Sequence, residues 1–426
     1  MIDSLMAMLF VVGYLAIAFE HRLHINKTAA AILTGVFLWA LYSMKEFGQQ
    51  GIYQYADAVV KELHKHLPDI AQIIIFLLGA MAIVALIETY GGFKIITDFI
   101  RTKNKRKLLW IIAFITFFLS SVLDNLTATI VMISLLRRLI HEREDRLIFA
   151  SVIVIAANAG GAWTPIGDVT TTMLWIGGRI TTAKIMKSLF LPSAISVIFP
   201  LIYFTFLIKK GEATLPPHHE STALERGGKQ VFFLGIGSLI FVPVFRALTD
   251  LPPFMGILLG LGLLWVFTDL LHYEKDHLKI PHILTKLDYT SILFFLGILL
   301  AVAALESVGI LTRLAASMDA SLKNKDLIVT LLGILSSVVD NVPLTAATMG
   351  MYPLSVYPVD SKIWEMLAFS VGTGGSLLII GSAAGVVAMG MEKINFFWYL
   401  KKITLPAFIG YLLGIFAYIA IYSMLS

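Results

Sequence analysis

The sequence contains the run SSVLDN at residues 120–125 and the run SSVVDN at residues 336–341. Each run lies near the middle of a long apolar stretch, which covers residues 108–136 in the first case and 326–354 in the second. A polar interruption inside such a stretch is typical of a re-entrant helical hairpin, which enters and leaves the membrane on one side. The two runs therefore predict two hairpins with polar tips.

Other landmarks recur at nearly the same offset. FLLG begins twelve residues before Glu88, and FFLG begins twelve residues before Glu306. The glycine pair at 160–161 recurs at 374–375, and the Leu-Pro dipeptide at 191–192 recurs at 405–406. The offsets of the four landmarks are 218, 216, 214 and 214 residues. Landmarks that stay in register over more than a hundred residues predict an internal repeat.

The repeat predicts how the chain is organised. We expect a first repeat over 1–208, a cytoplasmic linker over 209–230 and a second repeat over 231–426. Matching spans are separated by an odd number of crossings, so the two repeats should be inverted relative to each other, as in many secondary transporters. Glycine and proline should unwind one helix of each repeat near mid-membrane, within 147–176 and within 363–390.

The composition fits this architecture. Of the 426 residues, 58% are hydrophobic and 14% are charged, whereas a soluble domain carries about 25% charged residues. A soluble enzyme of this length could not bury so much apolar surface, so we predict an all-α polytopic membrane protein that is not an enzyme. There is no cysteine, and we expect no cofactor and no nucleic-acid partner. The remaining expected spans are 2–19, 29–44, 70–89, 189–208, 231–248, 254–272, 288–306 and 403–424.

The distribution of basic residues predicts the orientation. Suppose that the N-terminus is external and both hairpins are re-entrant. The cytoplasmic loops then carry 22 of the 33 Lys and Arg residues, and these loops are 20–28, 94–107, 137–146, 209–230, 273–287 and 392–402. The external loops carry the other 11, and these loops are 45–69, 177–188, 246–253, 310–325 and 355–362. An excess of Lys and Arg marks the cytoplasmic side. The chain is therefore predicted to have both termini outside.

Asp124 and Asp340 are the first candidates for chemistry. A carboxylate inside an apolar membrane segment costs several kcal/mol unless it is paired, hydrated or neutralised. Each aspartate could simply cap a half-helix, but both are followed by an asparagine, Asn125 or Asn341. This recurrence favours a shared ion site, in which the two Asp-Asn pairs hold Na⁺.

The first unwound stretch adds further oxygen ligands, since it contains Asn158, Thr164 and Asp168. Its counterpart, from Ser370 to Ser382, has no carboxylate. Close packing through small residues is the alternative interpretation of both stretches. The hydroxyl groups expected to support the site are those of Ser120, Ser121, Thr127, Thr170, Thr171, Ser336, Ser337, Thr345, Thr373 and Ser376.

Glu88 and Glu306 end matching spans. They either anchor those spans at the membrane interface or form a proton path to the central site.

An oxygen-rich, negatively charged site suits a small hard cation such as Na⁺. Neither Lys nor Arg occurs in the proposed tips and unwound segments. Burial favours the protonated form of a carboxylic acid. One site could therefore hold either Na⁺ or protons, and alternating access would then give cation/proton exchange.

The first hairpin motif and the string NAGGAWTPIGDVTT at 158–171 resemble the NhaD family of bacterial Na⁺/H⁺ antiporters. The resemblance covers essentially the whole chain. It implies export of Na⁺ or Li⁺ in exchange for external protons across a bacterial cytoplasmic membrane. It also implies a homodimer in which each protomer has a scaffold and an elevator-like moving part. It also implicates Asp124, Asn125, Asn158, Asp168, Thr170, Thr171, Asp340 and Asn341.

Two alternatives stay open at this point. Relatives in the same superfamily carry dicarboxylates, citrate or arsenite, and the carboxylate carriers typically present Ser-Asn-Thr at the tips. Here an aspartate takes the serine position in both halves and would repel an anion. A membrane scaffold or sensor that retained the fold would show no flux at all.

Overall fold

The computed structural model describes residues 2–18, 20–50, 55–97, 100, 102–208, 211, 224–272 and 275–425. Within these ranges the protein is all-helical, without a β-strand. Eight of the described helices are long and apolar enough to cross a membrane, so the chain is a polytopic membrane protein, as the composition predicts. These helices are α3 (Lys27–Gln50), α4 (Tyr55–Thr89), α8 (Arg143–Gly161), α10 (Thr182–Leu207), α11 (Gly228–Thr249), α12 (Pro253–Leu271), α14 (Tyr289–Ser307) and α21 (Thr404–Leu425).

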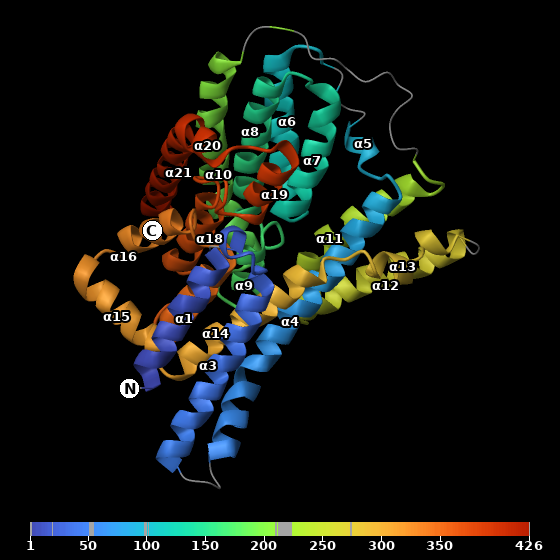
Figure 1. Cartoon of the computed structure of the whole chain (residues 1–426). Helices are drawn as coiled ribbons and strands as arrows, with labels where there is room; N and C mark the ends of the chain where they lie inside the picture. The colour runs from blue at the N-terminus through green and yellow to red at the C-terminus, as the bar shows by residue number, and fades with distance from the viewer. Residues whose placement is uncertain are drawn as a thin grey trace.

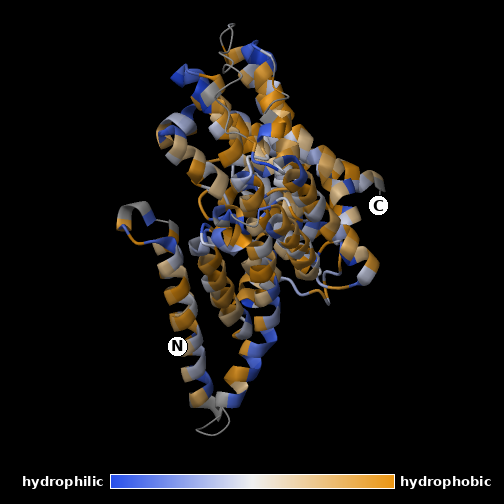
Figure 2. Ribbon diagram, turned by 90° about the vertical axis from the view of Figure 1, so that its right-hand side faces the viewer, coloured by the Kyte–Doolittle hydropathy of each residue, from blue (hydrophilic) through white to orange (hydrophobic). Residues whose placement is uncertain are grey.

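The shorter helices include those that form the tips and the interfaces. Figure 2 shows hydrophobic residues along most of the helices and hydrophilic residues at their ends and around the middle of the molecule. The shorter helices are α1 (Ile2–Ala18), α2 (Glu20–Leu23), α5 (Lys94–Thr97), α6 (Lys105–Ser120), α7 (Asn125–Leu139), α9 (Val169–Ile176), α13 (Ile280–Leu284), α15 (Ile310–Leu322), α16 (Lys325–Leu335), α17 (Asn341–Met351), α18 (Lys362–Gly374), α19 (Ala383–Glu392) and α20 (Phe396–Lys402), and Asp276–Leu278 forms a 3₁₀ turn.

Every predicted span coincides with a helix or with a pair of helices, but several helices extend further than predicted. α4 begins at Tyr55, fifteen residues before the predicted span 70–89, in a segment expected to be an external loop. Hydropathy finds only the part of a helix that lies in lipid. The extension YADAVVKELHKHLPD carries charges that suit water and good helix formers that continue the helix into it.

Four apolar stretches are broken, and each break separates two helices. The breaks lie between α6 and α7, between α8 and α9, between α16 and α17, and between α18 and α19. Each second helix starts with a side-chain cap, from Asp124, Asp168, Asp340 and Ser382 respectively. A side chain that accepts a hydrogen bond from the first turn stabilises a helix that starts in the interior.

The helices pack into two bundles (Figure 1). The continuous-helix bundle comprises α1, α3, α4 and α11–α14, and the broken-helix bundle comprises α6–α10 and α16–α21. Each bundle takes helices from both halves of the chain. α17 and α9 lie where the bundles meet, because α17 packs on α14 and α9 packs on α4.

Equivalent positions in the two halves make equivalent contacts. The Ser120 hydroxyl donates to the carbonyl oxygen of Ala157 at 2.6 Å, and the Ser336 hydroxyl donates to that of Val371 at 3.0 Å. A Cβ at Gly160 would clash with a backbone carbonyl of α6, and a Cβ at Gly374 would clash with one of α16. The same small-residue packing therefore joins each hairpin to its broken helix. The inversion of the two repeats stays a prediction.

Candidate functional site

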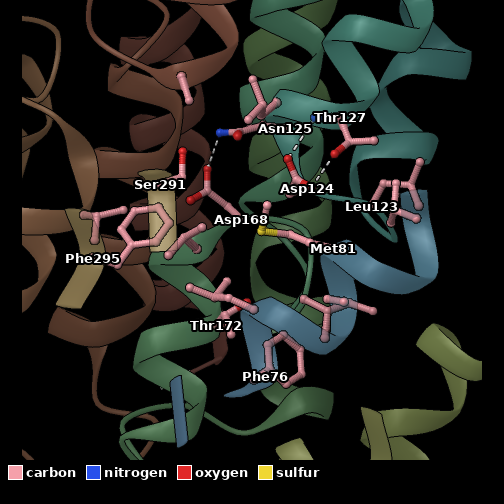
Figure 3. Close-up of a pocket in the computed structure, with 18 of the residues that line it drawn as sticks. Phe76, Met81, Leu123, Asp124, Asn125, Thr127, Asp168, Thr172, Ser291 and Phe295 are labelled. Carbon is pink, nitrogen blue, oxygen red and sulfur yellow. Dashed lines mark hydrogen bonds between the residues drawn. The ribbon is translucent and has the colours of Figure 1, made fainter. Parts of the chain in front are cut away.

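A cavity of about 110 Å³ lies between the two bundles (Figure 3). The continuous-helix bundle contributes apolar side chains to its wall, among them Phe76, Met81 and Phe295. The polar side chains that line it come mainly from the helix breaks: Asp124, Asn125, Thr127, Asp168, Asp340 and Asn341. The structure thus brings together the two hairpin tips and the first unwound segment, which lie far apart in the sequence.

Asp168 is at the centre of this polar cluster and is 1% exposed. Its Oδ1 accepts hydrogen bonds from the backbone N–H of Thr170 at 2.8 Å and from the Thr170 hydroxyl at 2.9 Å. Its Oδ2 accepts one from the Asn125 amide at 2.7 Å. The Asn341 amide nitrogen lies 3.4 Å from both oxygens. Both hairpin tips therefore meet at one carboxylate.

A chain of amides links this carboxylate to the fourth helix break. The Asn125 amide nitrogen also donates to Oδ1 of Asn158 at 3.0 Å. The amide nitrogen of Asn158, which is fully buried, donates to the Ser382 hydroxyl at 3.0 Å. Ser382 caps α19 by accepting from the N–H of Gly385 at 3.2 Å. The start of every half-helix is thus joined to its neighbours through side chains.

The two tip aspartates differ in their partners. Asp124 accepts hydrogen bonds from the backbone N–H of Thr127 at 2.8 Å and from its hydroxyl at 2.6 Å (Figure 3). The equivalent residue in the second tip is Pro343, which has neither a hydroxyl nor an N–H. Asp340 instead accepts from the N–H of Val342 at 3.1 Å, and its other oxygen faces Lys27.

Lys27, at the start of α3, is a residue that the sequence analysis missed. Its ammonium lies 3.5 Å from Oδ2 of Asp340 and 4.6 Å from the centre of the Phe294 ring, and it lines the cavity. The sequence places Lys27 in a predicted loop, 313 residues from Asp340. Ser382 is a second site residue that the sequence motifs do not predict. Its only sequence signal is that it lies 214 residues after Asp168, which is the offset of the glycine pairs.

The predicted hydroxyl groups fall into two classes. Thr127 and Thr170 donate to the aspartates, and Thr171 donates to the carbonyl oxygen of Asp168 at 2.8 Å. The others donate to backbone carbonyls, either within a helix turn or across a break, and hold the breaks in shape. This second class contains Ser120, Ser121, Thr164, Ser336, Ser337, Thr345, Thr373 and Ser376.

Glu88 and Glu306 do not line the central cavity. Glu88 is exposed at the end of α4. Glu306 lines a second cavity of about 200 Å³ with His66, Asp69 and Arg179. A role for either glutamate in proton movement stays a prediction.

The central cavity has the electrostatics of a cation site. Its lining carries three carboxylates and one ammonium, so it is net negative when all are ionised. In the part of the chain that the structure describes, no three acidic or histidine side chains are close enough to hold one metal ion. A cation here would combine a carboxylate with amide, hydroxyl and carbonyl oxygens, the hard ligands that suit Na⁺.

Comparison with known proteins finds one matching family model and several similar antiporters. A family model described as citrate transporter matches residues 14–366. Sodium/proton antiporter 2 of Arabidopsis thaliana is 50% identical, over 98% of this chain and 99% of the relative. Sodium/proton antiporter 1 of the same plant is 49% identical, over 99% of this chain and 73% of the relative. The Na⁺/H⁺ antiporter NhaD of Alkalimonas amylolytica is 28% identical, over 96% and 88% of the two chains.

Proposed function

The chain belongs to the citrate transporter family and, within it, to the NhaD-type antiporters, and on this basis we propose that it exchanges cytoplasmic Na⁺ or Li⁺ for external protons. The observation that carries the proposal is the position of Asp168, a buried carboxylate that both hairpin tips approach through Asn125 and Asn341. Such a group binds a cation or a proton, and each occupant excludes the other.

The ligands are proposed from the same geometry. Na⁺ binds among Asp124, Asn125, Asp340 and Asn341, with Asp168 as the carboxylate between the two tips. The four half-helix N-termini would by themselves attract anions. Aspartates cap three of the four and reverse this preference, because they place full negative charges where the partial positive charges lie.

Transport of an organic anion is the second candidate, because the matched family model is described as citrate transporter. Lys27 is the observation that favours it, since a carboxylate substrate needs a positive partner. That ammonium already faces Asp340, however, and the cavity holds three carboxylates in all. Citrate would add further negative charge to this cavity, so we place the anion second.

The movement that exposes the site alternately to the two sides is proposed to be displacement of the broken-helix bundle against the continuous-helix bundle. The central cavity lies at their boundary and is lined by both, which supports this division. A homodimer would hold the continuous-helix bundle as a fixed scaffold. Relatives come from a plant as well as from bacteria, and the bacterial inner membrane and the external termini stay predictions.

The test is proton flux in everted vesicles from bacteria that lack their own antiporters. After respiration has acidified the lumen, NaCl or LiCl should dissipate the pH gradient, and choline chloride should not. Asp168→Asn should reduce the flux to background, because an amide cannot neutralise the cation. Asp250→Asn, an exposed aspartate at the end of α11, should keep the wild-type flux.

An equal Na⁺ response in Asp168→Asn would remove this site from the mechanism. A well-expressed wild-type protein without a response to any alkali cation would refute exchange. Uptake of labelled citrate would then become the experiment to perform.

A further inference from the structure

Lys27 is held in place by the packing of its helix rather than by its own charge. Near Lys27, the Thr28 hydroxyl donates to the carbonyl oxygen of Thr290 on α14 at 3.0 Å. Farther along, Gly35 and Gly297 bring the two backbones so close that a Cβ on either would lie within 2.7 Å of backbone atoms. Lys27 therefore projects from a fixed point of the continuous-helix bundle.

The charge of Lys27 does not serve its own helix. Lys27 is the first residue of α3, where the partial positive charge of the helix N-terminus disfavours a cation. Its partners belong to other elements. The ammonium faces Asp340, at the start of α17 in the broken-helix bundle, and the ring of Phe294 on α14. The ion pair thus crosses the boundary along which the cavity lies.

The two tips differ in the donors that they offer to their aspartates. In the first tip, the Thr127 hydroxyl and N–H engage both oxygens of Asp124. In the second tip, Pro343 provides no such donors, and Oδ2 of Asp340 has Lys27 as its partner. The side chains of Lys27 and Asp340 are 31% and 18% exposed, and both line the cavity, so both are accessible to an ion that enters it.

We propose that Lys27 is a tethered counter-ion that sets the Na⁺ affinity of the site. Its ammonium neutralises Asp340 while the site is empty, and Na⁺ must displace it to reach that carboxylate. The flexible four-carbon stem permits such a displacement, and the Phe294 ring offers the displaced ammonium a favourable contact. This inference rests on the proposed exchange of Na⁺ for protons and adds a residue that tunes it.

The proposal also has a consequence for the contact between the two bundles. The ion pair joins Lys27 of one bundle to Asp340 of the other. Binding of Na⁺ beside Asp340 therefore breaks a polar contact between the bundles at the moment when the site becomes loaded. Lys27 is therefore a positioning residue: it affects Na⁺ through its ion pair with Asp340.

The experiment compares the NaCl concentration for half-maximal exchange in proteoliposomes at one fixed pH. Lys27→Met removes the charge, Lys27→Gln removes it but keeps a polar side chain, and Lys27→Arg retains it. Loss of a unit positive charge a few ångströms from the bound cation should lower the half-maximal concentration on the order of tenfold. The arginine variant should stay within about twofold of the wild type. Lys45→Met is the matched control, because Lys45 lies on the same helix and pairs with Asp3.

Each outcome separates this inference from the function on which it rests. A lower half-maximal concentration in both neutral variants, with wild-type values for Lys27→Arg and Lys45→Met, supports the tethered counter-ion. An unchanged or higher value in the two neutral variants, in a wild type that exchanges Na⁺, overturns it and leaves the exchange intact. A wild-type protein without Na⁺-dependent flux overturns the proposed function and this inference together. Using two neutral variants, with purified protein quantified before reconstitution, guards against a single misfolded substitution.

Discussion

Asp168 and Asn158 show how buried polar side chains can be satisfied without water. The carboxylate receives hydrogen bonds from Thr170 and Asn125, and the amide of Asn158 joins Asn125 to Ser382. The bonds of Asn125 and Asn158 join different broken helices, whereas the bond of Thr170 lies at the start of α9. A buried polar group that loses its partner costs more than the net value of the bond, so the cluster ties the breaks to one another.

Ser382→Ala tests that link. The substitution leaves the buried amide nitrogen of Asn158 without its acceptor and removes the cap of α19. We expect the free energy of unfolding in detergent to fall by about 1–3 kcal/mol. Ser376→Ala is the control, because the Ser376 hydroxyl donates only to a carbonyl one turn earlier, and it should cost less than about 1 kcal/mol. Equal losses in the two variants would show that the link contributes no stability.

The broken helices were accessible to sequence reasoning, whereas the polar helix extensions were not. An aspartate or three glycines within an apolar stretch conflict with a continuous membrane helix, and that conflict located all four breaks near residues 121–124, 162–168, 336–340 and 375–382. The extension of α4 before residue 70 lies outside the apolar stretch, so no apolar signal marked it. The role of Lys27 depends on a contact over 313 residues, which no local pattern encodes.

Close packing at the glycine positions can be tested by adding one methyl group. At Gly374 a Cβ would clash with the backbone carbonyl of Gly333, which cannot move independently of its helix. Gly374→Ala should therefore lower the free energy of unfolding by about 1–3 kcal/mol. At Gly262 on α12 no atom lies within 4 Å of a new Cβ, so Gly262→Ala should be neutral or stabilising by up to about 1 kcal/mol. Thermal unfolding in detergent distinguishes the two, and a stable Gly374→Ala would contradict the close approach.

As a whole, the molecule places its polar cavity where two bundles of different construction meet. The continuous-helix bundle supplies apolar walls and Lys27, and the broken-helix bundle supplies the aspartates and asparagines. A further contact across the boundary is the hydrogen bond from Arg246 on α11 to the carbonyl oxygen of Trp175 at the end of α9, at 2.8 Å. A transporter that works by relative movement of the bundles must break and remake such contacts.

The predicted orientation can be tested directly, because the chain has no cysteine of its own. Lys103 and Ser321 are both exposed. Lys103 lies in a segment predicted to be cytoplasmic, and Ser321 lies in one predicted to be external. A membrane-impermeant maleimide should label Ser321→Cys in intact cells. It should label Lys103→Cys only after the cells are permeabilised. Labelling of both residues from the same side would contradict the orientation inferred from the basic residues.

The competition between Na⁺ and protons at the Asp168 cluster is tested most directly by proton release. Na⁺ is added to the purified protein in weakly buffered detergent solution at neutral to mildly alkaline pH. NaCl and LiCl should release protons saturably, choline chloride should release none, and Asp168→Asn should lose the release. Saturable Na⁺ binding without proton release, or undiminished release from Asp168→Asn, would contradict competition at this site.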